Sequence, residues 1–415
     1  MRDDARRVVL LLADPASYRF GSFEDAARTL GITPIRGMLR QQPGPPPRAG
    51  TIDLIAADFE SVMRAVEEIE ARYGTLRILA IDDGAVELAA RINQQRVEPH
   101  NDPAAGLAAR NKIVMRQRFA AAGLRTPAWA PFDPSATHVT LYPYPIVIKP
   151  AVLNGSRGVM RVNDPTEMSI RSARLTNLLV EEGLEPGASN ALWESFIPGI
   201  EVALDGLMTG GALTVLAIFD KPDPLDGPFF EETVYVTPSR LPAEIQQAIS
   251  ETAGAMAGAI GLRQGPVHAE MRINEQGVWP LEIASRSIGG QCSSILEFDG
   301  ASLEAVILRH AFGEPIDLAG RASDSRGVIM IPIPAEGMLR GVSGVDEAEA
   351  VANVAGVQIT AAINHPIRAL PEGASYLGFI FARASTPDAV EEALRQAHAC
   401  LRFDIAPMLR LVSHS

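Results

Sequence analysis

The chain has 415 residues and a net charge of −13, with 47% hydrophobic and 21% charged residues. This length exceeds one ordinary hydrophobic core, so we expect two to three domains of a soluble globular protein. The acidic balance excludes nucleic acid as the main partner, although a local basic site for phosphates is compatible with it. No apolar run is long enough for a membrane span, and the N-terminus lacks a signal-peptide pattern. With Cys292 and Cys400 alone, a disulfide framework is excluded, and a cytoplasmic protein is predicted.

The first hundred residues alternate apolar runs with amphipathic segments, which predicts an open sheet of parallel strands with crossover helices. We expect Ser22 to cap the first helix and Gly31 to end it. No G-x-G-x-x-G motif opens a helix, so the usual dinucleotide fingerprint is absent. Residues 41–48, which are rich in proline, are predicted to be a loop. The predicted strands are 8–13, 54–57 and 77–82, and the predicted helices are 22–30, 61–73 and 86–93.

The remaining chain predicts two further units. Residues 101–325 read as an antiparallel-rich α+β module that begins with helix at 101–132, broken near Gly123 and Pro127. Residues 326–415 read as a small α+β module that ends in a helix at 387–401. In the larger module the predicted strands are 192–196, 200–208, 213–219 and 234–237, a strand–turn–strand unit covers 144–162, and a helix covers 242–260. In the smaller module a strand is predicted at 326–332 and a helix near 345–354.

The segment 265–290 is the most informative part of the chain. It predicts a hairpin whose three-residue loop, 275–277, places Gly277 in the left-handed position. That loop length sets Glu270 opposite Glu282. Facing carboxylates repel each other unless a cation lies between them, and hard cations such as Mg²⁺ prefer oxygen ligands of this kind. A loop of two or four residues would separate the two side chains onto opposite faces. The alternative is a solvated amphipathic hairpin with acidic side chains.

Residues 146–159 suggest a phosphate site. Lys149 ends an apolar strand, and a turn containing Gly155, Ser156 and Gly158 follows it. Glycine-rich turns let backbone N–H groups surround phosphate oxygens, and lysine supplies a point charge. The alternative is a plain hairpin turn, since Asn-Gly is a strong hairpin signal.

Two further segments fit an adenine nucleotide. Lys112 opens a helix from which it could reach phosphates; as a lone lysine it could equally be a solvated helix side chain. Glu194 and Glu201 flank a Pro-Gly turn, where the backbone could pair with adenine and Glu201 could hold ribose hydroxyls.

Several residues are candidates for contacts with a substrate. His268 shares a strand face with Glu270, and its alternative role is that of a satisfied core histidine. Glu232 could present its carboxylate to a substrate amino group, or it could lie in a solvated loop. Arg286 could bind a phosphoryl group through its planar guanidinium, or it could only form a salt bridge with Glu282. The chain turns just beyond Arg286, at Gly289 and Gly290, which are further candidates. Seven scattered histidines give no zinc pattern, and no Ser/His/Asp set has a recognisable spacing.

Taken in order, these residues resemble the ATP-grasp superfamily over nearly the whole chain. The resemblance implies an N-terminal Rossmann-like pre-ATP-grasp domain (1–100), an ATP-grasp domain (101–325) and a C-terminal α+β lid (326–415). It also implies a function for each candidate. Lysines at positions 112 and 149 would bind ATP phosphates beneath the glycine loop. Glutamates 194 and 201 would match hinge and ribose contacts, glutamates 270 and 282 would be Mg²⁺ ligands, and arginine 286 would stabilise an acyl phosphate and the transition state after it.

One position departs from many members of the superfamily. Ala284 stands where they place an asparagine that ligates metal, so the completeness of two Mg²⁺ sites is open. This pattern is similar to the L-amino-acid ligases of the bacilysin-synthetase type and to the biotin-carboxylase-like C-terminal arrangement, and it argues against a D-alanine–D-alanine ligase.

The resemblance implies an ATP-dependent ligase that activates a small-molecule carboxylate as an acyl phosphate and joins it to an amine, with amino acids as expected substrates. The alternatives are a biotin-carboxylase-like or purine-pathway-like ATP-grasp enzyme that activates bicarbonate or formate, and an ATP-binding module without turnover. A homodimer is one possible assembly.

Overall fold

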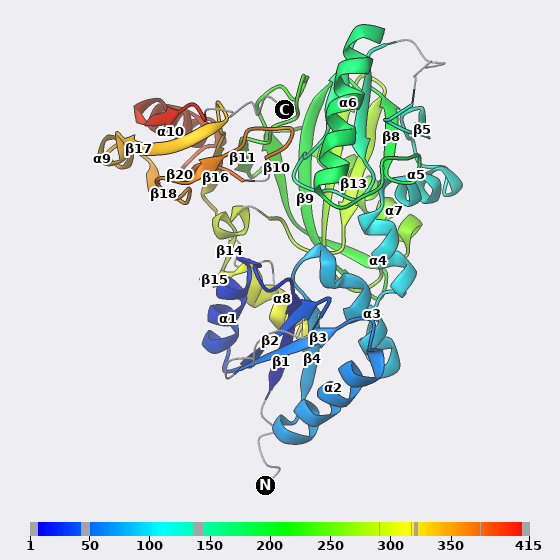
Figure 1. Ribbon diagram of the computed structural model, residues 1–415. Coiled ribbons are helices and arrows are strands. Elements are labelled where there is room, and N and C mark those ends of the chain that lie inside the picture. The colour runs from blue at the N-terminus through cyan, green and yellow to red at the C-terminus, as the bar shows by residue number, and fades with distance from the viewer. Residues whose placement is uncertain are drawn as a thin grey trace.

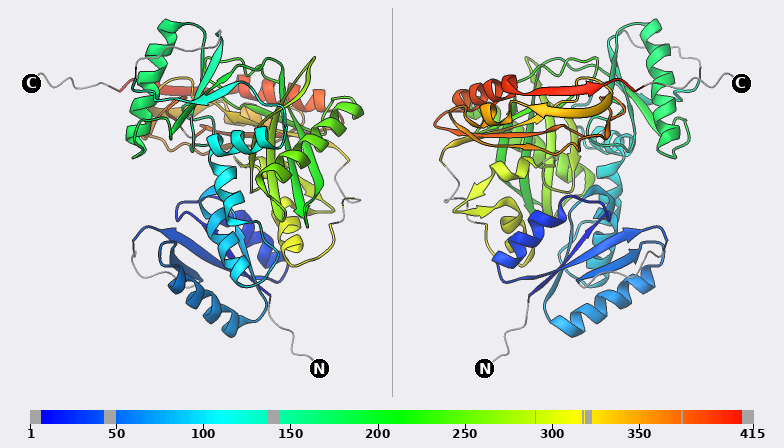
Figure 2. Two further views of the ribbon diagram at one scale, coloured as in Figure 1. Left: turned by 90° about the vertical axis from the view of Figure 1, so that its right-hand side faces the viewer. Right: turned by 60° about the vertical axis from the view of Figure 1, so that its left-hand side comes forward.

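The computed structural model describes residues 7–42, 50–136, 144–289, 291–316, 318, 323–373 and 375–408. An N-terminal lobe lies below a central lobe and a smaller C-terminal lobe (Figures 1 and 2). Within these ranges, no helix is long and apolar enough to cross a membrane.

The N-terminal lobe is the predicted parallel α/β sheet, with strand order β3-β2-β1-β4. Strand β1 is buried along its whole length, as its apolar run predicts. Strand β2 was not predicted, because its sequence contains Pro34 and two arginines and has no continuous apolar run. The strands are β1 (Val8–Ala13), β2 (Thr33–Arg40), β3 (Thr51–Ile55) and β4 (Leu76–Ala80), and the helices are α1 (Phe20–Thr29), α2 (Phe59–Tyr73) and α3 (Val86–Gln95).

The predicted cap of α1 was wrong. The helix begins before Ser22, its N-cap residue is Arg19, and no side chain caps it. The Ser22 hydroxyl instead donates a hydrogen bond to the Arg19 carbonyl. Gly31 follows the helix with a left-handed φ of 68°, as expected. Most of the predicted loop at 41–48 lies outside the described residues.

The central lobe begins with helices α4 (Pro103–Arg110) and α5 (Lys112–Ala121). They are separated at Asn111, which has an extended backbone and whose side chain accepts hydrogen bonds from the N–H groups of Ile113 and Val114. The predicted helix therefore breaks earlier than Gly123, because the asparagine caps a new helix at that point.

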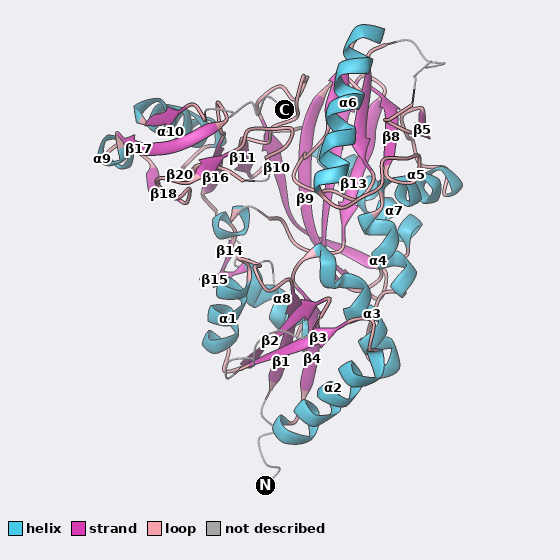
Figure 3. Cartoon of the chain, in the orientation of Figure 1, coloured by secondary structure: helices cyan, strands magenta, loops and turns pink. Residues whose placement is uncertain are grey.

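A four-stranded sheet follows, with order β5-β8-β6-β7, and helix α6 packs against it (Figure 3). Helix α6 was not predicted, although its signal is present in the sequence: Asp164 caps it, Pro165 stands in the first turn, and its buried residues recur at helical spacing. The elements are β5 (Trp129–Pro131), β6 (Ile146–Pro150), β7 (Met160–Val162), α6 (Pro165–Glu181) and β8 (Ala191–Ser195).

An eight-stranded sheet, of order β13-β12-β9-β10-β11-β16-β20-β18, joins the central and C-terminal lobes. The predicted domain boundary between residues 325 and 326 lies at the start of β16, inside this sheet, so the division remains a prediction. The strands are β9 (Ile200–Thr209), β10 (Ala212–Lys221), β11 (Val234–Thr237), β12 (Gly265–Asn274), β13 (Gly277–Ala284), β16 (Ser325–Ile331), β18 (Val354–Ile359) and β20 (Gly378–Ala384). Helix α7 (Ala243–Ile260) packs on β9, β10, β12 and β13.

Helix α10 (Pro387–Cys400) covers β16 and β20, close to the predicted final helix. The helix predicted near 345–354 is only α9 (Val345–Glu349), because β18 begins at Val354. A small sheet joins β17 (Gly337–Ser343), β19 (Pro366–Ile367) and β21 (Arg402–Ala406).

One hydrophobic core unites the three lobes. It contains Val9 of β1, Ala203 of β9, and Met330 of β16 and Phe379 of β20. Helix α8 (Leu303–Ala311), which was not predicted, contributes to this core and packs on α1, together with the short strands β14 (Glu297–Phe298) and β15 (Ala301–Ser302). The shared core holds the lobes around a common cavity.

Candidate active site

A cavity of about 1200 Å³ lies where the lobes meet. This exceeds the roughly 300–1,000 Å³ of a typical pocket for one small ligand, so it has room for more than one molecule. The turn after β6, the hairpin β12–β13 and the segment after β4 all reach it. The predicted site residues that line it are Lys112, Lys149, Gly155, Ser156, Glu194, Glu201, Glu232, His268, Glu270, Glu282, Arg286 and Gly289. Gly290 lies outside the described residues.

The hairpin has a different loop from the predicted one, yet it brings the same two carboxylates opposite each other. Asn274 pairs with Gly277, so the loop has two residues and the predicted three-residue loop was wrong. A bulge then restores the register: Met271 pairs with Pro280, and Glu270 pairs with Glu282. Pro280 has no N–H to donate to the ladder, which is the usual reason for a proline to stand at a bulge. The sequence alone does not reveal that a bulge adds one residue to this strand.

Three carboxylates meet beside the hairpin. Glu201, Glu232 and Glu270 each offer an oxygen, and these oxygens lie within 4.8 Å of one another. Their common partner is Lys221, at the end of β10, whose Nζ lies 2.8, 2.6 and 2.9 Å from them in that order. Burial opposes the lysine charge, but the carboxylates outweigh it and hold the pKa of Lys221 well above its ordinary value. We call Glu201, Glu232 and Glu270 the acidic cluster.

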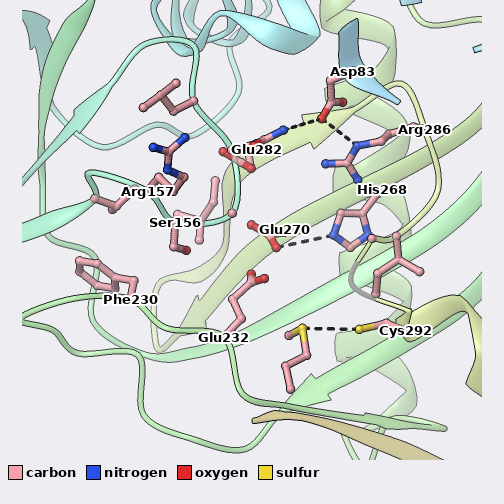
Figure 4. Close-up of a pocket in the computed structure, with 18 of the residues that line it drawn as sticks. Asp83, Ser156, Arg157, Phe230, Glu232, His268, Glu270, Glu282, Arg286 and Cys292 are labelled. Carbon is pink, nitrogen blue, oxygen red and sulfur yellow. Dashed lines mark hydrogen bonds and ion pairs between the residues drawn. The ribbon is translucent and has the colours of Figure 1, made fainter. Parts of the chain in front are cut away.

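Glu282 is not part of this cluster. Its Oε2 lies 3.2 Å from the Nζ of Lys112, and its side chain is about one third exposed. Figure 4 shows Glu282 and the cluster members Glu232 and Glu270 reaching into the same space. Lys221 supplies one positive charge to the three carboxylates of the cluster. A set of carboxylate oxygens that faces a cavity also fits a hard divalent cation. The donor chemistry therefore fits Mg²⁺, with Glu232 as an additional candidate beside the predicted Glu270 and Glu282.

His268 links the acidic cluster to a buried aspartate. Its Nδ1 lies 2.8 Å from Asp205 Oδ1, and its Nε2 lies 3.6 Å from Glu270 Oε1. Burial opposes protonation, but the hydrogen bonds to the two carboxylates raise the pKa of His268 to about 9. His268 is thus both buried and part of the cavity wall, as a cation at neutral pH.

Lys149 and Glu194 form a buried group with Arg116. The carboxylate of Glu194 lies 2.7 Å from Lys149 Nζ through one oxygen and 2.7 Å from Arg116 Nε through the other. Arg116 is fully buried and stands one helical turn beyond Lys112 on α5. Burial lowers the pKa of Lys149 to about 8, although Glu194 opposes the shift. The Glu194 side chain, predicted to contact the nucleotide hinge, is a counter-ion for these two cations.

Replacing Glu194 by glutamine should destabilise the folded protein by about 3–5 kcal/mol, because Arg116 and Lys149 would lose the carboxylate that both contact. Burial opposes ionisation of Glu194, but the two cations lower its pKa from 4.5 to about 2. Between these two pH values the unfolded chain binds the extra proton, so wild-type stability falls as the pH drops through that window. Urea unfolding should show that the stability of Glu194→Gln falls less than that of the wild type over the same pH window. The control is Glu275→Gln, exposed at the hairpin tip. Equal stability of wild type and Glu194→Gln at neutral pH would contradict this assignment.

The turn at residues 154–158 uses its glycines in two ways. Gly155 has a left-handed φ of 60° and open space around it, and Ser156 shares this conformation. At Gly158, by contrast, a Cβ would lie 2.9 Å from Leu178 and 3.0 Å from Pro150, and its N–H donates to the Pro371 carbonyl. Gly158 does not line the cavity. It allows close packing, and the part of the turn that faces the cavity is Gly155 and Ser156.

Arg286 reaches across to the N-terminal lobe. Its Nε lies 2.8 Å from Asp83 Oδ2, rather than pairing with Glu282 as the alternative interpretation had it. Asn154 of the glycine turn donates to the same oxygen at 3.2 Å (Figure 4). Burial opposes ionisation of Asp83, but Arg286 outweighs it and the pKa of Asp83 is lowered. Asp83 therefore connects the N-terminal lobe, the glycine turn and Arg286.

Comparison with known proteins agrees with this architecture. Residues 142–295 match the ATP-grasp domain family, and residues 329–406 match the L-amino acid ligase C-terminal domain 2. The chain therefore contains an ATP-grasp domain. The predicted ATP-grasp resemblance and fold class are confirmed. The crystal structure of an L-amino acid ligase from Bacillus licheniformis is similar, with a TM-score of 0.77 and 23% identity, over 97% of this chain and all of that one.

Two further proteins are similar to this chain in sequence. An uncharacterised protein, y4rH, from Sinorhizobium fredii is 25% identical over 97% of this chain and 84% of its own length. A D-alanine–D-alanine ligase from Synechococcus is 25% identical over 44% of this chain. That alignment spans about half of the ligase, 56% of its length.

Four residues that contact the predicted site residues were not themselves predicted: Lys221, Arg116, Asp83 and Asp205. The composition contains a signal for Lys221. Of the 37 basic residues, 34 are arginines and only three are lysines, namely Lys112, Lys149 and Lys221. Each lysine is buried at this site. Like Lys149, Lys221 ends an apolar strand, so the same reasoning would have found it.

Proposed function

We propose that the protein is an ATP-dependent carboxylate–amine ligase that joins two amino acids through an acyl phosphate. The observation that carries the proposal is the meeting of Lys112, Lys149 and Arg286 with Glu270 and Glu282 in one cavity. The match of the C-terminal module to that of L-amino acid ligases supports amino acids as the substrates.

The basic and acidic residues of the cavity have different proposed roles. Lys112 and Lys149 would hold phosphate oxygens of ATP, and the turn with Gly155 and Ser156, which lines the same cavity, would add backbone N–H groups. Bound Mg²⁺ would neutralise phosphate oxygens and act as a Lewis acid. Glu270 and Glu282, with Glu232, are the residues that would hold it.

Arg286, which lines the cavity, would stabilise the phosphoryl group as it passes to the substrate carboxylate. A planar guanidinium can donate two parallel hydrogen bonds to phosphoryl oxygens, and its contact with Asp83 fixes its orientation. His268, held as a cation by Asp205, would add positive charge to the cavity wall beside Glu270. An acyl phosphate has to be kept from water until the amine attacks it, and the lobes that meet around the cavity would serve that purpose.

The test is a screen for ATP-dependent phosphate release over pairs of amino acids, with mass spectrometry of the product. We expect release that requires both amino acids and Mg²⁺, and a product whose mass equals the sum of the two less water. Release with bicarbonate or formate instead would favour the alternative enzyme class. Absence of release with every substrate, despite ATP binding, would leave a binding module without turnover.

Replacing Lys149 by alanine should weaken ATP binding by about tenfold or more, since a charge-assisted contact contributes roughly 1.5–3 kcal/mol. Calorimetric titration measures the dissociation constant directly, and an unchanged value would contradict the assignment.

A lysine-directed reagent gives a second readout in the wild-type protein, because the chain has three lysines in all. Burial lowers the pKa of Lys149 to about 8, so just above pH 8 a larger fraction of this lysine is neutral than of an ordinary lysine. Lys221, paired with three carboxylates, serves as the internal control and should stay unmodified. Mg²⁺ and ATP should protect Lys149 from acetylation, as peptide mass mapping can show.

The predicted cytoplasmic location and homodimer are untested by these observations and remain predictions.

A further inference from the structure

The glycine turn at residues 154–158 is held from outside its own sheet. The Gly158 N–H donates to the Pro371 carbonyl at 2.8 Å, and Arg157 Nε donates to the Glu372 carbonyl at 3.2 Å. Both carbonyls belong to residues 368–373, which lie between β19 and β20 of the C-terminal lobe. We call residues 368–373 the C-terminal loop. The proposed reaction assigns no role to this loop.

The C-terminal loop also contacts helix α6 through paired charges. Arg174 Nη2 lies 2.7 Å from Glu372 Oε2, and Arg174 Nε contacts the other oxygen of the same carboxylate. Arg368 Nη1 lies 2.9 Å from Glu181 Oε2. Arg174 and Glu181 are about two helical turns apart, so they lie on one face of α6. Opposite charges therefore meet at both positions, and another alignment of loop and helix would bring like charges together.

The loop is the fixed side of this contact. Gly373 has no room for a Cβ, because the Arg368 carbonyl oxygen occupies that space, and its N–H donates to the Ala369 carbonyl at 2.9 Å. Pro371 is buried. At Gly155 of the turn, by contrast, the space around the backbone is open. The turn can therefore move while the loop keeps its shape.

The contact is polar and partly exposed, so it can open without unfolding either side. The side chains of Arg174 and Glu372 are 42% and 19% exposed. Exposed ion pairs contribute little to stability and are screened by salt. The hydrophobic core of the four-stranded sheet and α6 consists of residues of that unit, with Phe229 packed against it.

We infer that Glu372 is a positioning residue that latches the glycine turn over the cavity, and that opening of this latch controls how fast nucleotide enters and leaves. The inference rests on the proposed function for the identity of the nucleotide. Gly155, Ser156 and Arg157 line the cavity, whereas Glu372 does not. Glu372 therefore acts through the turn and α6, without touching the substrates.

The experiment compares the wild-type chain with Glu372→Ala by hydrogen–deuterium exchange and by nucleotide release. Peptides that cover residues 154–158 should exchange about threefold faster in the variant, since an exposed ion pair shifts an opening equilibrium by up to about fivefold. Release of the fluorescent analogue N-methylanthraniloyl-ATP, chased with excess ATP, should accelerate by a similar factor. Glu347→Ala, exposed on α9 of the same lobe, is the matched control and should leave both rates unchanged.

Two further measurements separate a latch from a merely structural contact. Arg174→Met removes the same ion pair from the helix side, so the double variant with Glu372→Ala should release the analogue no faster than Glu372→Ala alone. Raising the salt concentration should accelerate release from the wild type and hardly affect Glu372→Ala. A structural role would lower the melting temperature and leave the release rate and its salt dependence unchanged.

The outcomes distinguish this inference from the proposed function. Unchanged exchange of the turn in folded Glu372→Ala would overturn the inference, as would faster exchange with unchanged release of the analogue. If Glu372→Ala does not fold, Arg174→Met decides by the same two rates. A wild-type protein that does not bind the analogue would overturn the proposed function, and hydrogen exchange would still decide whether Glu372 holds the turn.

Discussion

Replacing Glu270 by glutamine should abolish amino-acid-dependent phosphate release, with a fall in kcat of about 100-fold or more, and leave the protein folded. The amide keeps the size of the side chain but loses the charge proposed to hold Mg²⁺. Folding should survive because Lys221 retains Glu201 and Glu232 as partners. Steady-state phosphate release over a Mg²⁺ titration measures the effect, and a thermal melt reports the fold.

Glu275→Gln is the matched control, since it makes the same chemical change at the exposed tip of the same hairpin. It should behave as wild type. If Glu270→Gln turned over normally at saturating Mg²⁺, the metal role of Glu270 would be refuted. A variant that has lost its cooperative melt would instead assign Glu270 to folding.

Replacing Arg286 by lysine should lower kcat and kcat/KM together, by about 100-fold or more, with little change in ATP affinity. A lysine keeps the charge but cannot donate two parallel hydrogen bonds to a phosphoryl group, so the loss falls on the transition state. Asp83→Asn should produce a smaller fall of the same kind, because it weakens the contact that orients the guanidinium.

Steady-state kinetics, calorimetric titration with ATP and a thermal melt together decide this second case. Arg263→Lys, an exposed arginine at the edge of the central lobe, is the control and should be neutral. A normal kcat with a lowered melting temperature in Arg286→Lys would make the ion pair with Asp83 a structural brace between lobes. Weakened ATP binding with an unchanged kcat would show that Arg286 binds ATP rather than stabilising the transition state.

The sequence by itself determined the class of fold, and the order of its motif residues gave the resemblance to the ATP-grasp superfamily. The fold class rests on local signals: the wholly apolar run of β1 and the alternation of strands and helices. Lysine at the end of the apolar strand β6 is a local signal of the same kind for a candidate site residue. Such patterns depend on which face of one element is buried. The spacing of apolar residues that are neighbours in the chain already shows that face. Where the local signal was weak, as in β2, the prediction failed.

The tertiary structure alone decided how these residues are paired. Lys221 meets three carboxylates from three other segments, and Arg286 meets Asp83, which lies about two hundred positions away in the chain. The register of Glu270 and Glu282 depends on a bulge beside Pro280 that loop length does not reveal. Contacts of this kind arise from packing between lobes, and no periodicity along the chain records them. Sequence therefore named most of the charged groups, and only the fold could show which of them neutralise one another and which face the cavity.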